Sequence, residues 1–178
     1  MKGADGQAAL RCWPVDVEVV GRSYRIVGRP AIDWILKLIH EDWLGIVPGL
    51  VDGDEIDDLI SDGMITTSDL IVAGRDATVA ATGMPWWAAC RILAIAGQSV
   101  ELMGAMVIAG VDPERVSIGA YVAALYRVMV AERDQKQRAS LDMDLLRVPP
   151  GVRTAELYDA KSAGMAFERA FAQQQQHG

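Results

Sequence analysis

Residues 83–130 read GMPWWAACRILAIAGQSVELMGAMVIAGVDPERVSIGAYVAALYRVMV, and this stretch decides the fold. Apolar residues recur at helical spacing on both sides of the turn at residues 110–113, so the sequence predicts two long apolar helices. The first opens at Pro85 and ends at Gly110, and Ser117 is the predicted cap of the second. A helix that is apolar on nearly every side is covered by its own core or by a partner. The stretch therefore indicates packing and partner binding rather than catalysis.

The tandem tryptophans at the start of the first helix are its most distinctive feature. Adjacent helix residues point about 100° apart, so one ring can anchor the core while the other faces an interface, where Trp is enriched. Both rings can instead lie within the core. The methionines of the two helices can likewise form an adaptable binding surface or fill the core. We take as candidate partner-binding residues Trp86, Trp87, Met103, Met106 and Met129.

The stripes of the first helix predict which residues are covered. One stripe consists of Trp86, Cys90, Leu93, Gly97, Val100 and Val107, and the other of Ile92, Ile95, Leu102, Met106 and Ala109. In the second helix, Ile118, Tyr121, Val122, Leu125 and Met129 form the apolar stripe. Its far end, AERDQKQRAS, is polar, so we expect that end to project into solvent.

The N-terminal part alternates with period two. Val15, Val17 and Val19 precede the turn Gly21-Arg22, and Tyr24 and Ile26 follow it, which predicts a β-hairpin. A helix is predicted from Pro30 to about Leu44, with residues 45–50 as a connector. Asp52 is a predicted cap for a short helix ending near Gly63, and Thr66 or Thr67 for another that ends at Gly83.

These elements give three parts. Residues 1–13 are a loose leader, 14–150 a hairpin plus helical domain, and 151–178 an amphipathic C-terminal helix with a polar tail. In the last part Leu157, Ala160, Ala163, Phe167 and Phe171 are roughly aligned on one side of a helix. The predicted fold class is mainly α, a helical bundle with a small N-terminal β-hairpin.

The composition limits the classes of function that the protein can have. Hydrophobic residues make up 51% and charged residues 23%, as in a folded protein, and the net charge of −7 disfavours binding to nucleic acid phosphates. The N-terminus lacks a signal-peptide pattern, and no uncharged run approaches the roughly 18–20 residues of a membrane span. We expect a soluble protein with no nucleic acid, membrane or small-molecule partner.

The polar residues give no catalytic, metal or cofactor site. The acidic run at residues 52–58 fails the calcium-loop pattern, because Ile56 and Gly63 fall where oxygen ligands are required. His40 lies beside Glu41 but has no nucleophile in a recognisable motif. Cys12 and Cys90 lack metal-ligand spacing, and Cys90 is predicted to be a buried, inert thiol. We therefore predict no enzyme activity and no cofactor.

Five segments in this order resemble the tail assembly chaperone family of long-tailed (siphovirus-type) bacteriophages. They are VEVVGRSYRIVGRPAIDWILKL, GLVDGDEIDDLI, ATGMPWWAACRILAIAG, GVDPERVSIGAYVAALYRVMV and LDMDLLRVPPG, and the resemblance covers about Val15 to Gly151. It implies a non-enzymatic protein of the host cytoplasm that self-associates and coats the tape measure protein, keeping it soluble until tail-tube subunits polymerise around it. It also implies a shorter and a longer product made by frameshifting, with the segment after Pro150 as a candidate extension.

Two other classes of function stay open. A virion structural protein, such as a head-to-tail connector or other tail component, can also be small, acidic and helical with a β-hairpin. A small helical enzyme would need a nucleophile, a base and an orienting group, which the sequence does not bring together in any motif. Chaperone and connector differ in behaviour, because a ring-forming connector should be a closed oligomer by itself.

Overall fold

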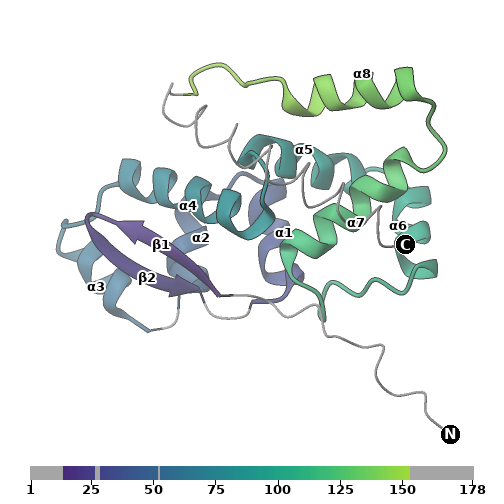
Figure 1. The fold of residues 1–178 in the computed structure, drawn as a ribbon. Helices are drawn as coiled ribbons and strands as arrows, with labels where there is room; N and C mark the ends of the chain where they lie inside the picture. The colour runs from purple at the N-terminus through teal and green to yellow at the C-terminus, as the bar shows by residue number, and fades with distance from the viewer. Residues whose placement is uncertain (1–13, 27–28, 52, 153–178) are drawn as a thin grey trace, which may run out of the picture.

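The computed structural model describes residues 14–26, 29–51 and 53–152 of the 178-residue chain. Within these ranges the chain forms one antiparallel hairpin and eight helices, which confirms the predicted fold class (Figure 1). In chain order the elements are β1 (Val15–Val19), β2 (Arg22–Ile26), α1 (Ala31–Ile39), α2 (Trp43–Leu50), α3 (Glu55–Ser61), α4 (Thr67–Thr82), α5 (Trp86–Gly97), α6 (Val100–Ile108), α7 (Ile118–Val130) and α8 (Gln135–Leu146). The hairpin, α2, α3 and α4 gather at one end, and α6 lies at the other (Figure 1).

The hairpin forms where the alternation predicts it, with its turn one residue earlier. Val20 and Gly21 both have positive φ, 50° and 73°, as a two-residue hairpin turn of type I′ requires. Arg22 is therefore the first residue of β2 rather than part of the turn. The alternation buries one side of the ribbon, Val17, Val19, Tyr24 and Ile26, and β1 packs on α4.

The single helix predicted from Pro30 to Leu44 is wrong, because the chain breaks after Ile39. Glu41 has a positive φ of 51°, and Asp42 then caps α2 by accepting a hydrogen bond of 3.1 Å from the amide of Gly45. The predicted connector at residues 45–50 is thus helical, and Pro48 lies inside it. Burial of the α2 face against α4 outweighs the backbone hydrogen bond that Pro48 cannot donate.

Helix α4 is central to the packing, because it contacts β1, α2, α5 and α7. Thr66, one of the two predicted caps, forms a capping box with Asp69 at its start, and Gly83 ends it with φ of 70°. Two glycines allow close crossings. A Cβ on Gly74 would lie 2.8 Å from the carbonyl oxygen of Trp43, and one on Gly119 would lie 2.5 Å from that of Ala81.

The single helix predicted from Pro85 to Gly110 is also wrong, since it divides into α5 and α6 at Gln98 and Ser99. Ser99 caps α6, because its Oγ accepts a hydrogen bond of 3.2 Å from the amide of Leu102. The break changes the direction in which the stripe points. Trp86, Cys90 and Leu93 are buried as predicted, whereas Gly97, Val100 and Val107 of the same predicted stripe are exposed.

Helix α7 starts at the predicted cap Ser117 and buries its predicted stripe. The polar stretch at residues 131–140 is exposed, as expected, but it does not continue α7. Asp134 caps a separate helix, α8, with Gln137 as the reciprocal partner. Leu141 and Leu145 of α8 are buried, and α8 lies across α5 (Figure 1).

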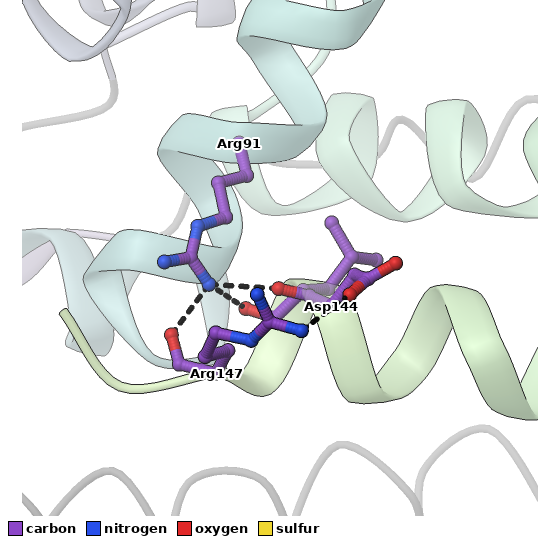
Figure 2. A network of polar contacts seen from close by, with 4 residues as sticks. Arg91, Asp144 and Arg147 are labelled. Carbon is purple, nitrogen blue, oxygen red and sulfur yellow. Dashed lines mark hydrogen bonds and ion pairs between the residues drawn. The ribbon is translucent and has the colours of Figure 1, made fainter.

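A single arginine fastens the end of α8 to α5. The Nη1 atom of Arg91 donates hydrogen bonds to the carbonyl oxygens of Asp144, Leu145 and Arg147 (Figure 2). These carbonyls have no partner within the helix, so the guanidinium caps the helix and also neutralises its negative dipole end. The side chain of Arg147 returns to Asp144 at 3.1 Å (Figure 2).

Several predictions lie outside the described residues: the leader at 1–13 with Cys12, the cap Asp52, and the C-terminal helix and tail from residue 153 onward. Within the described part, no helix by itself combines the length and apolar character of a membrane span. Helices α4 and α5 together reach the required length and composition only across a 73° bend.

A candidate partner-binding face on helix α6

Helix α6 points most of its apolar side chains outward. We call five residues the α6 face: Val100, Met103, Gly104, Val107 and Ile108. The exposed fractions of Val100, Val107 and Ile108 are 85%, 75% and 89%. At 100° per residue, the five positions span about 140° of the helix circumference. Only Met106 of this helix is buried, so α6 presents to solvent the kind of side chains that α5 buries.

The α6 face is also nearly free of charge. Between Arg91 and Asp112 the sequence has one charged residue, Glu101, at the edge of the face. Its carboxylate accepts a hydrogen bond of 3.0 Å from Ser99 Oγ, which holds it at the start of the helix. A contiguous exposed apolar patch on a protein surface marks an interaction site. A binding face of this kind selects for apolar shape and not for a fixed charge pattern.

Other exposed apolar residues in the described part are more scattered. Ile32 and Leu36 on α1 form a second, smaller pair at helical spacing. Val20 lies in the hairpin turn, and Met64 precedes α4. Scattered apolar residues are normal on protein surfaces, whereas four large ones on a nine-residue helix are not. The α6 face is therefore the strongest candidate for a binding surface.

Both tryptophans of the pair lie in the core, rather than one in the core and one at an interface. Trp86 and Trp87 are each 4% exposed, and their rings meet edge to face with centroids 5.4 Å apart. Trp43 of α2 packs on Trp86 at 5.0 Å, and the guanidinium of Arg75 lies 4.3 Å from the Trp86 centroid. Both rings are covered because α1, α4, α7 and α8 surround α5. Neither ring presents surface to a partner in this conformation.

The three candidate methionines divide between surface and core. Met103 is 41% exposed on the α6 face, and its sulfur accepts a hydrogen bond of 3.9 Å from the hydroxyl of Tyr121. Met106 and Met129 are buried. Among the five candidates, Met103 is thus the one with substantial exposed surface. Sequence reasoning missed Val100, Gly104, Val107 and Ile108, although Ser99, a good cap residue, signalled that a new helix begins there.

The cysteine and histidine side chains of the described part form no reactive site. Burial raises the pKa of the Cys90 thiol to about 12, and the charge of Glu41 adds to the increase. A thiol with that pKa stays protonated near neutral pH, so Cys90 is unreactive. His40 ends α1 and is exposed. Among residues 14–26, 29–51 and 53–152, no group of three His, Cys, Asp or Glu side chains could hold a metal ion.

The acidic residues at positions 54–58 lie at the start of α3, as expected of a helix N-terminus. Asp54 is the N-cap residue, and Glu55, Asp57 and Asp58 occupy the first turn, where the helix dipole favours negative charge. Glu55 also forms an ion pair of 2.9 Å with Arg22 of the hairpin. These carboxylates therefore lie at the positive end of the helix dipole, and Glu55 ties α3 to β2.

A cavity of about 150 Å³ lies between the base of the hairpin and helices α1, α4 and α7. Arg29 and Ser117 supply polar atoms to its wall. Arg29 Nε donates to the carbonyl of Leu50 at 3.2 Å, and Ser117 Oγ accepts from the amide of Ala120 at 3.2 Å. These bonds hold the fold, and the volume is below the roughly 300–1,000 Å³ of ligand pockets. The cavity is not a candidate ligand site.

Taken together, the surface of α6 departs furthest from an ordinary solvated helix. Its exposed residues can bind an apolar helix of another segment or chain by side-chain packing, without fixed charges. No protein-family model, curated protein or solved structure significantly matches this chain.

Proposed function

We propose that the protein is a non-enzymatic tail assembly chaperone of a long-tailed bacteriophage, which binds apolar helical segments of the tape measure protein and keeps them soluble during tail assembly. The observation that carries this proposal is the α6 face, an outward apolar stripe on a well-formed helix. The order of segments that resembles the chaperone family supports it independently.

The α6 face suits a client made of long amphipathic helices. Helix recognition uses apolar side chains at positions i, i+3, i+4 and i+7. Val100, Met103 and Val107 supply such side chains at the first, second and fourth of these positions, and Gly104 is at the third. Met103 adds a flexible, polarisable side chain that adapts to different partners. Because Glu101 is the one charge on α6, a client needs no matching charge at each binding position. Several segments of one long client can therefore bind the same face.

The charge of the whole chain suits a basic or neutral client. A net charge of −7 keeps many copies apart in solution and attracts positively charged segments over distances of about a Debye length, roughly 8–10 Å. The attraction sets the rate of encounter, and apolar packing on α6 sets the lifetime of the complex. This division predicts binding that weakens only modestly with added salt.

The test is co-expression of the chain with a fragment of the tape measure protein, followed by size-exclusion chromatography with light scattering. The wild-type chain should keep the fragment soluble in a large complex. Val107→Asp should release it to the insoluble fraction. Met143→Asp is the matched control, because Met143 is 71% exposed on α8, close to the 75% of Val107, and lies on a different helix.

Two results would contradict the proposal in different ways. If Val107→Asp retains the fragment as well as Met143→Asp does, the α6 face is not the client site. If the wild-type chain forms a closed ring by itself and ignores the fragment, a virion connector becomes the better assignment.

A further inference from the structure

Helix α8 reverses direction after α7 and runs back across α5 (Figure 1). The reversal takes place within residues 131–134, which we call the α7–α8 linker. Ala131 still has helical backbone angles, with φ of −56° and ψ of −42°, whereas Asp134 is extended, with ψ of 171°. The interruption between the two helices is therefore short, and it depends on the backbone angles of very few residues.

The residue types around the linker favour one continuous helix. Residues 120–148 contain neither glycine nor proline, and Ala131, Glu132 and Arg133 are good helix formers. The local stop signal is Asp134, whose carboxylate accepts a hydrogen bond of 2.8 Å from the amide of Gln137. A continuous helix would pair the first amides of α8 with the last carbonyls of α7. The local sequence thus favours continuity, and the docking of α8 on α5 favours the break.

The docking contacts of α8 are few and specific. Leu141 and Leu145 are its buried residues. The hydroxyl of Tyr126 on α7 donates a hydrogen bond of 2.7 Å to the Asp142 carboxylate, and Arg91 on α5 binds the carbonyls at the end of α8 (Figure 2). These contacts do not involve the α7–α8 linker. An α8 that arrives from a second copy of the chain can therefore make them equally well.

The same contacts make a straightened chain unstable by itself. Without docking, Leu141 and Leu145 would be exposed to water, and Arg91 would lose its carbonyl acceptors on a helix that is mostly buried. A second α8 on the vacated surface of α5 restores all of these contacts. Exchange of an identical element between copies is a low-cost route to a dimer, because the interface already exists within one chain.

We propose that two copies of this chain exchange their α8 helices. In each copy, α7 and α8 join into one helix from Ile118 to Leu146, about 43 Å long, and α8 docks on α5 of the other copy. The closed monomer and the exchanged dimer then differ mainly in the α7–α8 linker. Residues 131–138 contain three basic and two acidic residues, so two linkers that lie together do not add to the repulsion between chains of net charge −7. The α6 face stays open in both forms, so the exchange does not rest on the proposed function.

The test compares Asp134→Ala with Asp134→Gly in the full chain. Asp134 is exposed, so both variants should fold. Alanine is a poor helix cap and a strong helix former, whereas glycine is a tolerable cap and a weak helix former. The alanine variant should favour the straight linker about tenfold more than the glycine variant, and the dimerisation constant, which depends on two linkers, about a hundredfold more. Refolding at a series of concentrations, followed by size-exclusion chromatography with light scattering, measures the constant.

The matched control is the same pair of substitutions at Ser140. This residue is exposed in the middle of α8 and is helical in both forms, so Ser140→Ala and Ser140→Gly should dimerise equally. Equal dimerisation of the two Asp134 variants, a preference as large at Ser140 as at Asp134, or monomers at every concentration would overturn the inference.

Two further measurements identify the contact within the dimer. The amides at residues 135 and 136 lie in the first turn of α8, where a separate helix supplies no acceptor, so their hydrogen–deuterium exchange should slow in the isolated dimer. Val107→Asp places a charge on the α6 face and should leave the exchanged dimer intact. A dimer that is lost in Val107→Asp, or whose amides at 135 and 136 exchange as fast as in the monomer, would be held together by another surface, and the exchange of α8 would be wrong.

Discussion

The guanidinium of Arg91 donates a hydrogen bond of 2.8 Å to the carbonyl oxygen of Asp144, 53 residues later in the chain (Figure 2). Arg91 is the charged side chain of α5, and it fastens the end of the polar helix α8 to a helix that is mostly buried. The contact explains how a helix with only two buried leucines stays docked.

Arg91→Met keeps the apolar stem of the side chain and removes its hydrogen bonds. We expect the free energy of unfolding to fall by about 1–2 kcal/mol, since charged hydrogen bonds and helix capping each contribute on that scale. Exchange of the α8 amides should rise more than that of α4. Arg115→Met is the control, because the Arg115 side chain is 83% exposed in its ion pair with Asp112 and should change stability little. Equal effects of the two variants would contradict the anchoring role.

Gly119→Ala should destabilise the protein through the crossing of α4 and α7. The new Cβ would lie 2.5 Å from the backbone oxygen of Ala81, so the two helices must separate. Overpacking of this kind costs about 1–3 kcal/mol, measurable by urea denaturation. Gly97→Ala is the matched control, since its Cβ would lie 3.7 Å from Ile39 Cδ1 in ordinary contact. A Gly119→Ala chain as stable as Gly97→Ala would mean that the two helices move apart freely.

Trp87→Ala should act on stability and not directly on a partner. Trp87 is buried against Trp86, so removing its ring should lower the free energy of unfolding by about 3–5 kcal/mol. Met103→Ala, on the half-exposed part of α6, should cost much less and should weaken retention of a tape measure fragment. Thermal melting and fragment retention, measured on both variants below their melting temperatures, distinguish the two roles. Loss of the fragment by a fully folded Trp87→Ala chain would restore an interface role for that ring.

Cys90 should be almost inert to thiol reagents while the protein is folded. Burial raises its pKa from 9.0 to about 12, so the thiolate fraction near pH 8 is lower by roughly a thousandfold. Labelling by iodoacetamide in a Cys12→Ser chain should therefore follow global unfolding. Because the folded pKa is the higher one, this group leaves stability unchanged below about pH 9 and lowers it as the pH rises from 9 toward 12. Rapid labelling of the native chain at pH 8 would show that the thiol is accessible and that its pKa is not strongly raised.

The sequence predicts elements best where local chemistry sets their ends. Thr66 with Asp69, Ser117 and Gly83 act locally, through their own hydrogen bonds or positive φ, and each lies where its residue type predicts. The break at Glu41 could not be predicted in this way. A non-glycine residue with φ of 51° is held there by the docking of α2 on α4, which is a long-range contact.

The sequence predicted the region of the candidate site and one of its residues, Met103, but not the other four. The apolar stretch from Pro85 to Val130 contains the α6 face, yet the prediction chose Trp86 and Trp87 because Trp is common at interfaces. Whether a large apolar side chain is core or surface depends on how many helices surround its own. Helix α5 is covered by α1, α4, α7 and α8, while α6 contacts α5 and α7.

The turn of the hairpin has a consequence for the order of folding. Val20 is a β-branched residue in the left-handed region, which costs about 1–2 kcal/mol that a glycine or asparagine would not incur. Residues 15–26 are therefore a poor hairpin by themselves, and packing on α4 stabilises the ribbon. Helix α4 is complete only at Thr82, which a ribosome adding about 5–20 residues per second reaches roughly 3–11 s after Ile26. Strands β1 and β2 thus wait for a later helix to pack against.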